Sequence, residues 1–167
     1  MGVKGHKKES PLSVKIGIIA MSSSRTVEED SSGAWMAKRA KKEGHEVVCH
    51  IVVPDNEEEI RKAIRDSIRD NKPDALLLTG GTGVAKADVT IEAIVPMFRK
   101  ELSSFAPVFA QLSLEKIDSA AIISRSAAGI IGETVVFSMP GSLNACKLAC
   151  KALIFPEVGH IVKHIRE

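Results

Sequence analysis

Apolar residues in this chain fall into short, nearly continuous runs. Three of them, residues 14–21 (VKIGIIAM), 45–53 (HEVVCHIVV) and 75–78 (ALLL), have the pattern of strands that are buried on both faces of a sheet. Pro54 ends the second run, and the third run leads directly into a glycine-rich segment. These runs predict the central strands of a parallel sheet.

Amphipathic segments separate the strands. A helix is predicted from about residue 33 to residue 43, where residues 30–32 (DSS) can cap its start and Gly44 can end it. A second helix is predicted to begin at Asp55, and its apolar residues recur with a 3.6-residue period until Pro73 breaks the pattern.

The rest of the chain adds two helices, a hairpin and a C-terminal helical region. The expected bounds are 88–95 and 102–112 for the helices, 129–131 and 134–137 for the hairpin strands, and 143–154 for a helix followed by a shorter one beyond Pro156. Strands that alternate with helices through the first hundred residues imply right-handed βαβ units. The pattern therefore predicts an α/β fold with a mostly parallel sheet.

Length and composition predict a single domain in the cytoplasm. The chain has 167 residues, of which 44% are hydrophobic, so we expect a flexible polar tail over residues 1–12 and a single domain over residues 13–167. A net charge of +2, one Trp and no Tyr argue against a nucleic-acid partner. No apolar run is long enough to span a membrane. Three cysteines suit a reducing cytosol better than a disulfide scaffold.

Four polar loops follow the predicted strands. They cover residues 22–30, 54–55, 79–88 and 138–142. Because ligands of open α/β sheets bind at the carboxyl ends of the strands, we expect these loops to meet around one ligand. Their hydroxyls, glycines and carboxylates suit a polar molecule that carries phosphate.

Residues 79–83 (TGGTG) carry the strongest local signal. Three glycines in five residues let the backbone approach an anion with its N–H groups. The segment matches neither the P-loop nor the dinucleotide-binding fingerprint. The alternative is a tight turn between strand and helix that needs positive φ angles and binds nothing.

Two aspartates in these loops have two interpretations each. Asp88 either caps the following helix or holds Mg²⁺ against a nucleotide phosphate. Asp55 resembles the first residue of a capping box whose last residue is Glu58, and as a carboxylate it is also a candidate for catalysis. The residues alone leave both pairs of alternatives open.

Two pairs of potential metal ligands lie four residues apart on predicted helices. They are Cys146 with Cys150 and His160 with His164. No second pair stands at a spacing typical of zinc sites, so we interpret the cysteines as core residues and the histidines as surface residues. Trp35 is likewise expected to pack rather than to stack on a base.

The order of several motifs resembles the MogA/MoaB family of molybdenum cofactor biosynthesis proteins, and its spacing is closer to the MoaB branch. The resemblance covers about residues 14–154. Its most specific pieces are TGGTG at 79–83, DVT at 88–90 and MPGS at 139–142. It is supported by DSSG at 30–33, Pro54-Asp55 and Ser124-Arg125.

This resemblance implies a three-layer αβα fold, a mostly parallel sheet with a C-terminal hairpin, and a homotrimer or hexamer. It also implies Mg²⁺-dependent transfer of AMP from the co-substrate ATP to molybdopterin, with a molybdenum insertase as a possible downstream partner. Asp55 and Asp88 would then be the catalytic carboxylates, and Asp88 would bind the metal. The residues expected to bind substrate are Ser22, Thr79, Gly80, Gly81, Thr82, Gly83, Thr90, Ser138, Pro140, Gly141 and Ser142.

One segment departs from the family pattern. Where the family shows Gly-Phe-Gly-Glu followed shortly by Arg, this chain reads Ser104-Phe-Ala-Pro and then Val108-Phe-Ala, so both the acid and the Arg are missing. A catalytically inactive molybdopterin-binding paralogue is therefore the alternative function. A purely structural role through oligomer surfaces is a third hypothesis.

Overall fold

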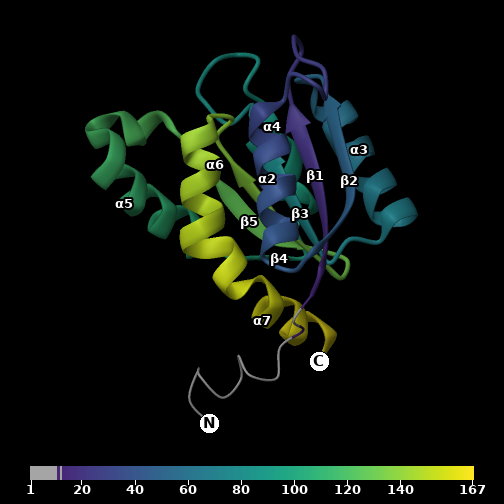
Figure 1. Ribbon diagram of the computed structural model, residues 1–167. Coiled ribbons are helices and arrows are strands. Elements are labelled where there is room, and N and C mark those ends of the chain that lie inside the picture. The colour runs from purple at the N-terminus through teal and green to yellow at the C-terminus, as the bar shows by residue number, and fades with distance from the viewer. Residues whose placement is uncertain (1–10, 12) are drawn as a thin grey trace.

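The computed structural model describes residue 11 and residues 13–167, and its strands form one mixed six-stranded sheet (Figure 1). The strand order is β2-β1-β3-β6-β5-β4. The strands are β1 (Lys15–Met21), β2 (Glu46–Val53), β3 (Ala75–Thr79), β4 (Lys100–Glu101), β5 (Ala127–Ile131) and β6 (Thr134–Met139). The three predicted apolar runs thus form neighbouring strands at one side of the sheet.

Parallel pairing joins β2, β1, β3 and β6, whereas β5 and β4 run antiparallel to their neighbours. The predicted hairpin is confirmed as β5 and β6, with Gly132 in the turn at a φ of 59°. Strand β4 was not predicted, because its two residues are exposed and carry no apolar pattern.

Helices cover both faces of the sheet. They are α2 (Ser31–Lys42), α3 (Glu57–Asn71), α4 (Thr90–Ile94), α5 (Phe105–Ile117), α6 (Leu143–Ala149) and α7 (Phe155–Arg166), with short 3-10 segments at 95–97 and 118–123. Side chains of α2, α5, α6 and α7 share one buried cluster with β1, β3 and β6. Side chains of α3 and α4 share the other cluster, on the opposite face. This arrangement confirms the three-layer αβα fold.

The C-terminal helical region is continuous through Pro156, where a break between two helices was predicted. A π-helical turn, Cys150–Ile154, joins α6 to α7, and the Phe155 N–H donates to the Cys150 carbonyl five residues earlier. Proline has no N–H and its ring crowds the carbonyl four residues before it, so a wider turn at this point lets the helix continue.

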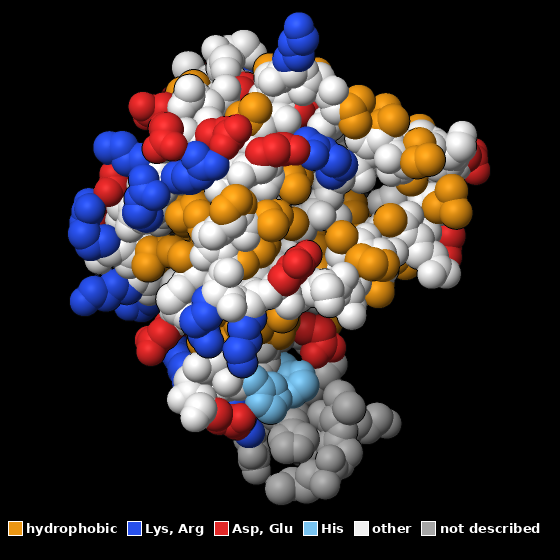
Figure 2. Space-filling model, turned by 180° about the vertical axis from the view of Figure 1, so that it is seen from behind, with side chains coloured by type: hydrophobic (Ala, Val, Ile, Leu, Met, Phe, Trp, Pro, Cys, Tyr) orange, Lys and Arg blue, Asp and Glu red, His pale blue; other side chains and the backbone are white. Residues whose placement is uncertain are grey.

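Several apolar side chains remain exposed on α5 and on the 3-10 segment after it. Figure 2 shows hydrophobic side chains gathered over this projecting part of the molecule. The exposed residues there are Val108, Leu114, Ile117, Ile122 and Ile123. In the part of the chain that the structure describes, no helix combines the length and apolarity needed to cross a membrane. The predicted tail over residues 1–12 lies, apart from Pro11, outside the described residues.

The three cysteines are free, and burial governs their chemistry. Cys146 and Cys150 are buried, as predicted for core residues, and Cys49 is partly buried. Burial raises the pKa of all three thiols, and most of all that of Cys150. Because the thiolate is the reactive form, native protein at pH 8 should release chromophore from Ellman's reagent slowly and at Cys49 only. Denatured protein should react at all three positions, and rapid release of two equivalents from native protein would contradict this prediction.

Candidate active site

The four polar loops meet at one edge of the sheet, as predicted, and enclose a cleft of about 610 Å³. This volume is within the range of small-molecule sites in proteins. The predicted residues that line it are Ser22, Asp55, Gly80, Gly81, Thr82, Gly83, Asp88, Pro140, Gly141 and Ser142. The remaining lining comes from Met21, Ser23, Ser24, Arg25, Ile123 and Ser124.

The glycine-rich loop turns sharply at the end of β3. Gly80 and Gly81 have φ angles of 96° and 62°, a region that residues with a Cβ rarely adopt. The Gly80 N–H donates to the Met139 carbonyl at 3.1 Å, and the Gly81 carbonyl accepts from the Thr90 N–H at 3.0 Å. Within the described residues, the N–H groups of residues 81–83 donate to no other protein atom. The loop therefore offers three successive main-chain donors beside the cleft, as an anion requires.

Arg125, which the sequence analysis did not select as a site residue, holds the carbonyl side of this loop. Its Nε donates to the carbonyls of Thr82 and Gly83, both at 3.0 Å, and its Nη2 donates to the Asp88 carbonyl at 3.3 Å. Both terminal nitrogens also bind the Glu92 carboxylate. Arg125 and Glu92 form what we call the loop clamp. By binding the carbonyls of Thr82, Gly83 and Asp88, the clamp fixes the conformation of the loop.

The loop clamp should weaken in acid. The hydrogen bond from Arg125 holds the pKa of Glu92 below its ordinary value. A depressed folded-state pKa stabilises the fold above the unfolded pKa, and this contribution disappears as pH falls through the lower folded value. At pH 7, Glu92→Gln should therefore cost at most about 1 kcal/mol, since the pair is partly solvated. In urea titrations the difference from wild type should shrink towards zero below about pH 4. A difference that does not change with pH would contradict this interpretation.

Asp55 does not cap helix α3, which corrects the capping-box interpretation. Asn56 is the N-cap, and its Oδ1 accepts from the N–H groups of Glu58 and Glu59 at 3.0 and 3.1 Å. Asp55 instead binds the first loop, because its Oδ2 accepts from the N–H and the hydroxyl of Ser23 at 2.9 and 2.8 Å. Its Oδ1 has no hydrogen-bond partner in the described part of the chain.

Asp88 is likewise not the cap of helix α4. Val89 occupies the N-cap position, and no side chain caps that helix. The Asp88 Oδ2 accepts from the Ala85 N–H at 2.9 Å, so the carboxylate closes a short loop beside Gly83. Asp88 Oδ1 makes no hydrogen bond among the described residues. Each of the two aspartates therefore lines the cleft and has one carboxylate oxygen, Oδ1, with no hydrogen-bond partner among the described residues.

These two carboxylates suit a site for Mg²⁺ that shares its ligands with a substrate. Among the described residues, no group of three or more His, Cys, Asp or Glu side chains could hold a metal by itself. Magnesium is usually bound by one or two carboxylates together with phosphate oxygens and water. Asp55 and Asp88 both line the cleft, so their carboxylates fit Mg²⁺ that shares its coordination with a phosphate-bearing ligand.

Three of the predicted substrate-binding residues lie behind the wall of the cleft. The Thr79 hydroxyl is buried and donates to the Pro140 carbonyl at 3.2 Å, and the Thr90 hydroxyl donates to the Gly80 carbonyl at 2.9 Å. Ser138 is fully buried in β6, and its hydroxyl has no hydrogen-bond partner among the residues that the structure describes. Thr79 and Thr90 therefore shape the loops, and none of the three hydroxyls lines the cleft.

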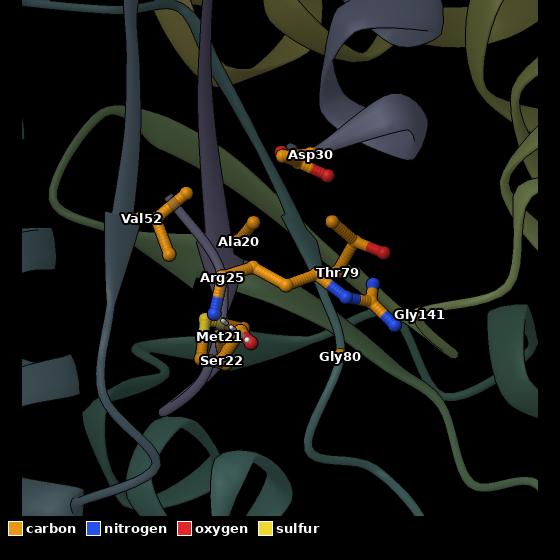
Figure 3. Close-up of a pocket in the computed structure, with 9 residues that line it drawn as sticks. All are labelled: Ala20, Met21, Ser22, Arg25, Asp30, Val52, Thr79, Gly80 and Gly141. Carbon is orange, nitrogen blue, oxygen red and sulfur yellow. Dashed lines mark hydrogen bonds between the residues drawn. The ribbon is translucent and has the colours of Figure 1, made fainter. Parts of the chain in front are cut away.

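The first loop brings a positive charge to the site. The Ser22 hydroxyl accepts from the N–H groups of Ser24 and Arg25 at 3.3 and 3.2 Å, which bends the chain back. Arg25, Asp30 and Gly141 line a small cavity of about 20 Å³, and Figure 3 shows the Arg25 side chain extending towards Gly141 with Asp30 above it. Arg25 was not predicted as a site residue. Its place in a loop at the carboxyl end of a strand was the available signal.

Asp30 caps helix α2 and lines the same small cavity. Its Oδ1 accepts from the Gly33 N–H at 2.9 Å, and its Oδ2 is 2.8 Å from the His50 Nε2. The Ser32 hydroxyl donates to the Gly141 carbonyl at 2.9 Å. The start of α2 is thus hydrogen-bonded to the loop after β6. This contact holds the loop that carries Gly141 in a fixed position relative to α2.

A second cavity of about 630 Å³ adjoins the cleft and shares Ser124, Pro140 and Ser142 with it. Its walls come mainly from α5, α6 and the π-helical turn after α6, and they are largely apolar, with three lysines. Of the departing segment at residues 104–110, Phe109 lines this cavity and none lines the main cleft. The segment that departs from the family pattern therefore borders the second cavity and contributes no side chain to the cleft that Asp55 and Asp88 line.

Comparison with known proteins agrees with this geometry. Residues 17–160 match the family model described as "Probable molybdopterin binding domain". The chain is 45% identical to molybdenum cofactor biosynthesis protein B of Bacillus subtilis, over 100% of this chain and 99% of that protein. It is 43% identical to the molybdopterin adenylyltransferase of Pyrococcus furiosus over the full length of both. A crystal structure of a molybdenum cofactor biosynthesis protein B superposes with a TM-score of 0.90 at 41% identity, covering 95% of this chain and 99% of that one.

Proposed function

The chain belongs to the molybdopterin-binding domain family of molybdenum cofactor biosynthesis proteins, and from that premise we propose that it transfers AMP from ATP to molybdopterin. In this proposal, residues 13–167 form one molybdopterin-binding domain. The observation that carries it is a cleft lined by two carboxylates, Asp55 and Asp88, together with residues 81–83, whose N–H groups have no protein partner among the described residues.

The reaction joins two phosphate groups. A phosphate oxygen of molybdopterin attacks the α-phosphorus of ATP and forms a new P–O bond. The bond between that phosphorus and the oxygen bridging to the β-phosphate breaks, and pyrophosphate leaves with the electron pair. The attacking oxygen is already anionic, so no protein nucleophile is needed. What the protein must supply is alignment and neutralisation of charge.

Residues of the cleft can meet both needs. The N–H groups of residues 81–83 bind phosphate oxygens, and the Arg25 guanidinium offers positive charge from the opposite loop. Asp55 and Asp88 would hold Mg²⁺, and the bound ion would offset the negative charge of the ATP phosphates. Pro140, Gly141 and Ser142 form the neighbouring wall for the nucleotide.

We further propose that the protein works as a homotrimer or hexamer and passes its product to a molybdenum insertase. The exposed apolar residues on α5 and the segment after it, such as Leu114, Ile117 and Ile122, support an assembly because monomers rarely leave such a group uncovered. Analytical ultracentrifugation would contradict this part of the proposal if it gave a monomer at micromolar concentration.

The direct test mixes purified protein with molybdopterin and Mg·ATP and follows adenylylated molybdopterin and pyrophosphate. Both products should appear in equal amounts, and removal of Mg²⁺ with EDTA should stop their formation. Binding of molybdopterin without either product, by protein that is folded by circular dichroism, would instead establish the inactive paralogue.

A further inference from the structure

A second cluster of ligand-type side chains lies on helix α7, away from the loops of the cleft. His160 and His164 are one helical turn apart, and their Nε2 atoms are 2.9 Å from each other. Their ring centroids are 4.7 Å apart. Figure 2 shows histidine side chains gathered at one end of the molecule, with acidic side chains nearby.

Carboxylates engage the other nitrogen of each ring. The His160 Nδ1 is 3.3 Å from a Glu157 oxygen, and the His164 Nδ1 is 2.8 Å from a Glu167 oxygen. A carboxylate accepts hydrogen bonds, so these contacts favour the tautomer in which each Nδ1 carries the proton. In the neutral imidazole, the lone pair is then on Nε2. In that tautomer two Nε2 lone pairs face each other across 2.9 Å, and a cation between them removes their repulsion.

We propose that His160 and His164 form a binding site for a late first-row divalent metal ion, of which Ni²⁺ and Cu²⁺ fit best. Imidazole nitrogen is a preferred ligand of these ions. Two metal–nitrogen bonds of about 2.05 Å at a right angle place their nitrogens about 2.9 Å apart, whereas a tetrahedral angle places them about 3.3 Å apart. The separation in the structure matches neighbouring positions of a square-planar or octahedral metal.

The surroundings of His160 and His164 favour metal binding over a packing role for the two rings. The side chains of His160 and His164 are 21% and 49% exposed, so water can complete the coordination. A carboxylate that accepts from the distal nitrogen of a metal-bound histidine fixes the ring and makes it a stronger donor. Glu157 and Glu167 occupy those two positions. The site would use one face of one helix and would not depend on the cleft or on its reaction.

The test is a calorimetric titration of Ni²⁺ chloride alone into full-length protein that has been treated with a chelator and then desalted. Saturable binding of about one ion per chain is expected, together with a rise in Tm because the ion binds the folded helix. His164→Gln should abolish the saturable phase and the Tm shift. Glu167→Gln keeps both ligands and should weaken binding about tenfold.

Two control variants separate this site from other sources of nickel affinity. His45→Gln removes an imidazole that packs against the Phe155 ring, and His6→Gln removes one that lies outside the described residues. Both should bind Ni²⁺ as the wild type does. Loss of binding in either control with retention in His164→Gln would overturn the proposal. Absence of saturable binding in the wild type would also overturn it and would mean that the two rings share only a proton.

Discussion

Asp88→Asn is expected to lower the rate of adenylyl transfer by about a thousandfold while leaving the fold intact, a loss at the upper end of what one electrostatic contact contributes to catalysis. The Asp88 Oδ2 accepts from the Ala85 N–H at 2.9 Å, and the asparagine oxygen can accept the same bond. What the substitution removes is the negative charge and the second oxygen that line the cleft. Molybdopterin turnover with Mg·ATP measures the loss directly.

Asp70→Asn supplies the matched control for this prediction. Asp70 is an exposed carboxylate near the end of α3 that pairs with Arg69, and it does not line the cleft. Both variants lose one negative charge, so any general effect of charge on ATP binding will appear in both. The two proteins should unfold within about 0.5 kcal/mol of wild type, as surface substitutions usually do. Activity of Asp88→Asn within tenfold of Asp70→Asn would exclude Asp88 as a metal ligand.

The position of the cleft could be predicted because it follows from strand order. Parallel strands place their carboxyl ends at the same edge, so the loops after β1, β2, β3 and β6 had to meet once the apolar runs were recognised. The same reasoning brought Asp55 and Asp88 into one cleft without any knowledge of side-chain direction. Elements with long apolar or periodic runs were therefore predictable to within a few residues.

The direction of individual side chains could not be predicted in the same way. Thr79 and Thr82 have the same chemistry in the same loop, yet the Thr79 hydroxyl points to the Pro140 carbonyl and Thr82 lines the cleft. The capping residue of α3 differs by one position from the expected one, because Asp55 and Asn56 are both good caps and only the Ser23 contact distinguishes them. Residue type leaves such choices open.

Arg125 shows a further limit. Arg125 binds carbonyls of a loop some forty residues earlier in the chain. Every residue has a main-chain carbonyl, so the sequence does not indicate which carbonyls a side chain will bind. The role of Arg125 depends on β5 running antiparallel to β6, because β5 then begins at the edge of the sheet where β6 and β3 end and the glycine loop lies. Only a three-dimensional arrangement reveals a residue that acts on the backbone of another element.

Gly80→Ala is expected to be the most damaging single-methyl addition in the site. The φ angle of Gly80 is 96°, and a Cβ at this position would lie 2.5 Å from the main-chain carbonyl oxygen of Met21. A main-chain atom in the central strand cannot move aside as the end of a side chain can. The variant should lose about 3 kcal/mol of unfolding free energy, from backbone strain and from overpacking together, as measured by urea titration.

Gly132→Ala separates the two contributions. Gly132 has a φ of 59° in the β5–β6 turn, and a Cβ there would meet no atom within 4 Å. This variant therefore carries the cost of a positive φ without the clash, about 1 kcal/mol, and should keep full adenylyl transfer. Gly80→Ala should in addition lose most of its activity, since relief of the clash must shift the loop whose N–H groups bind phosphate. If Gly80→Ala were no less stable than Gly132→Ala and equally active, the tight turn would be incidental to the site, and the anion-binding role of the loop would have to be abandoned.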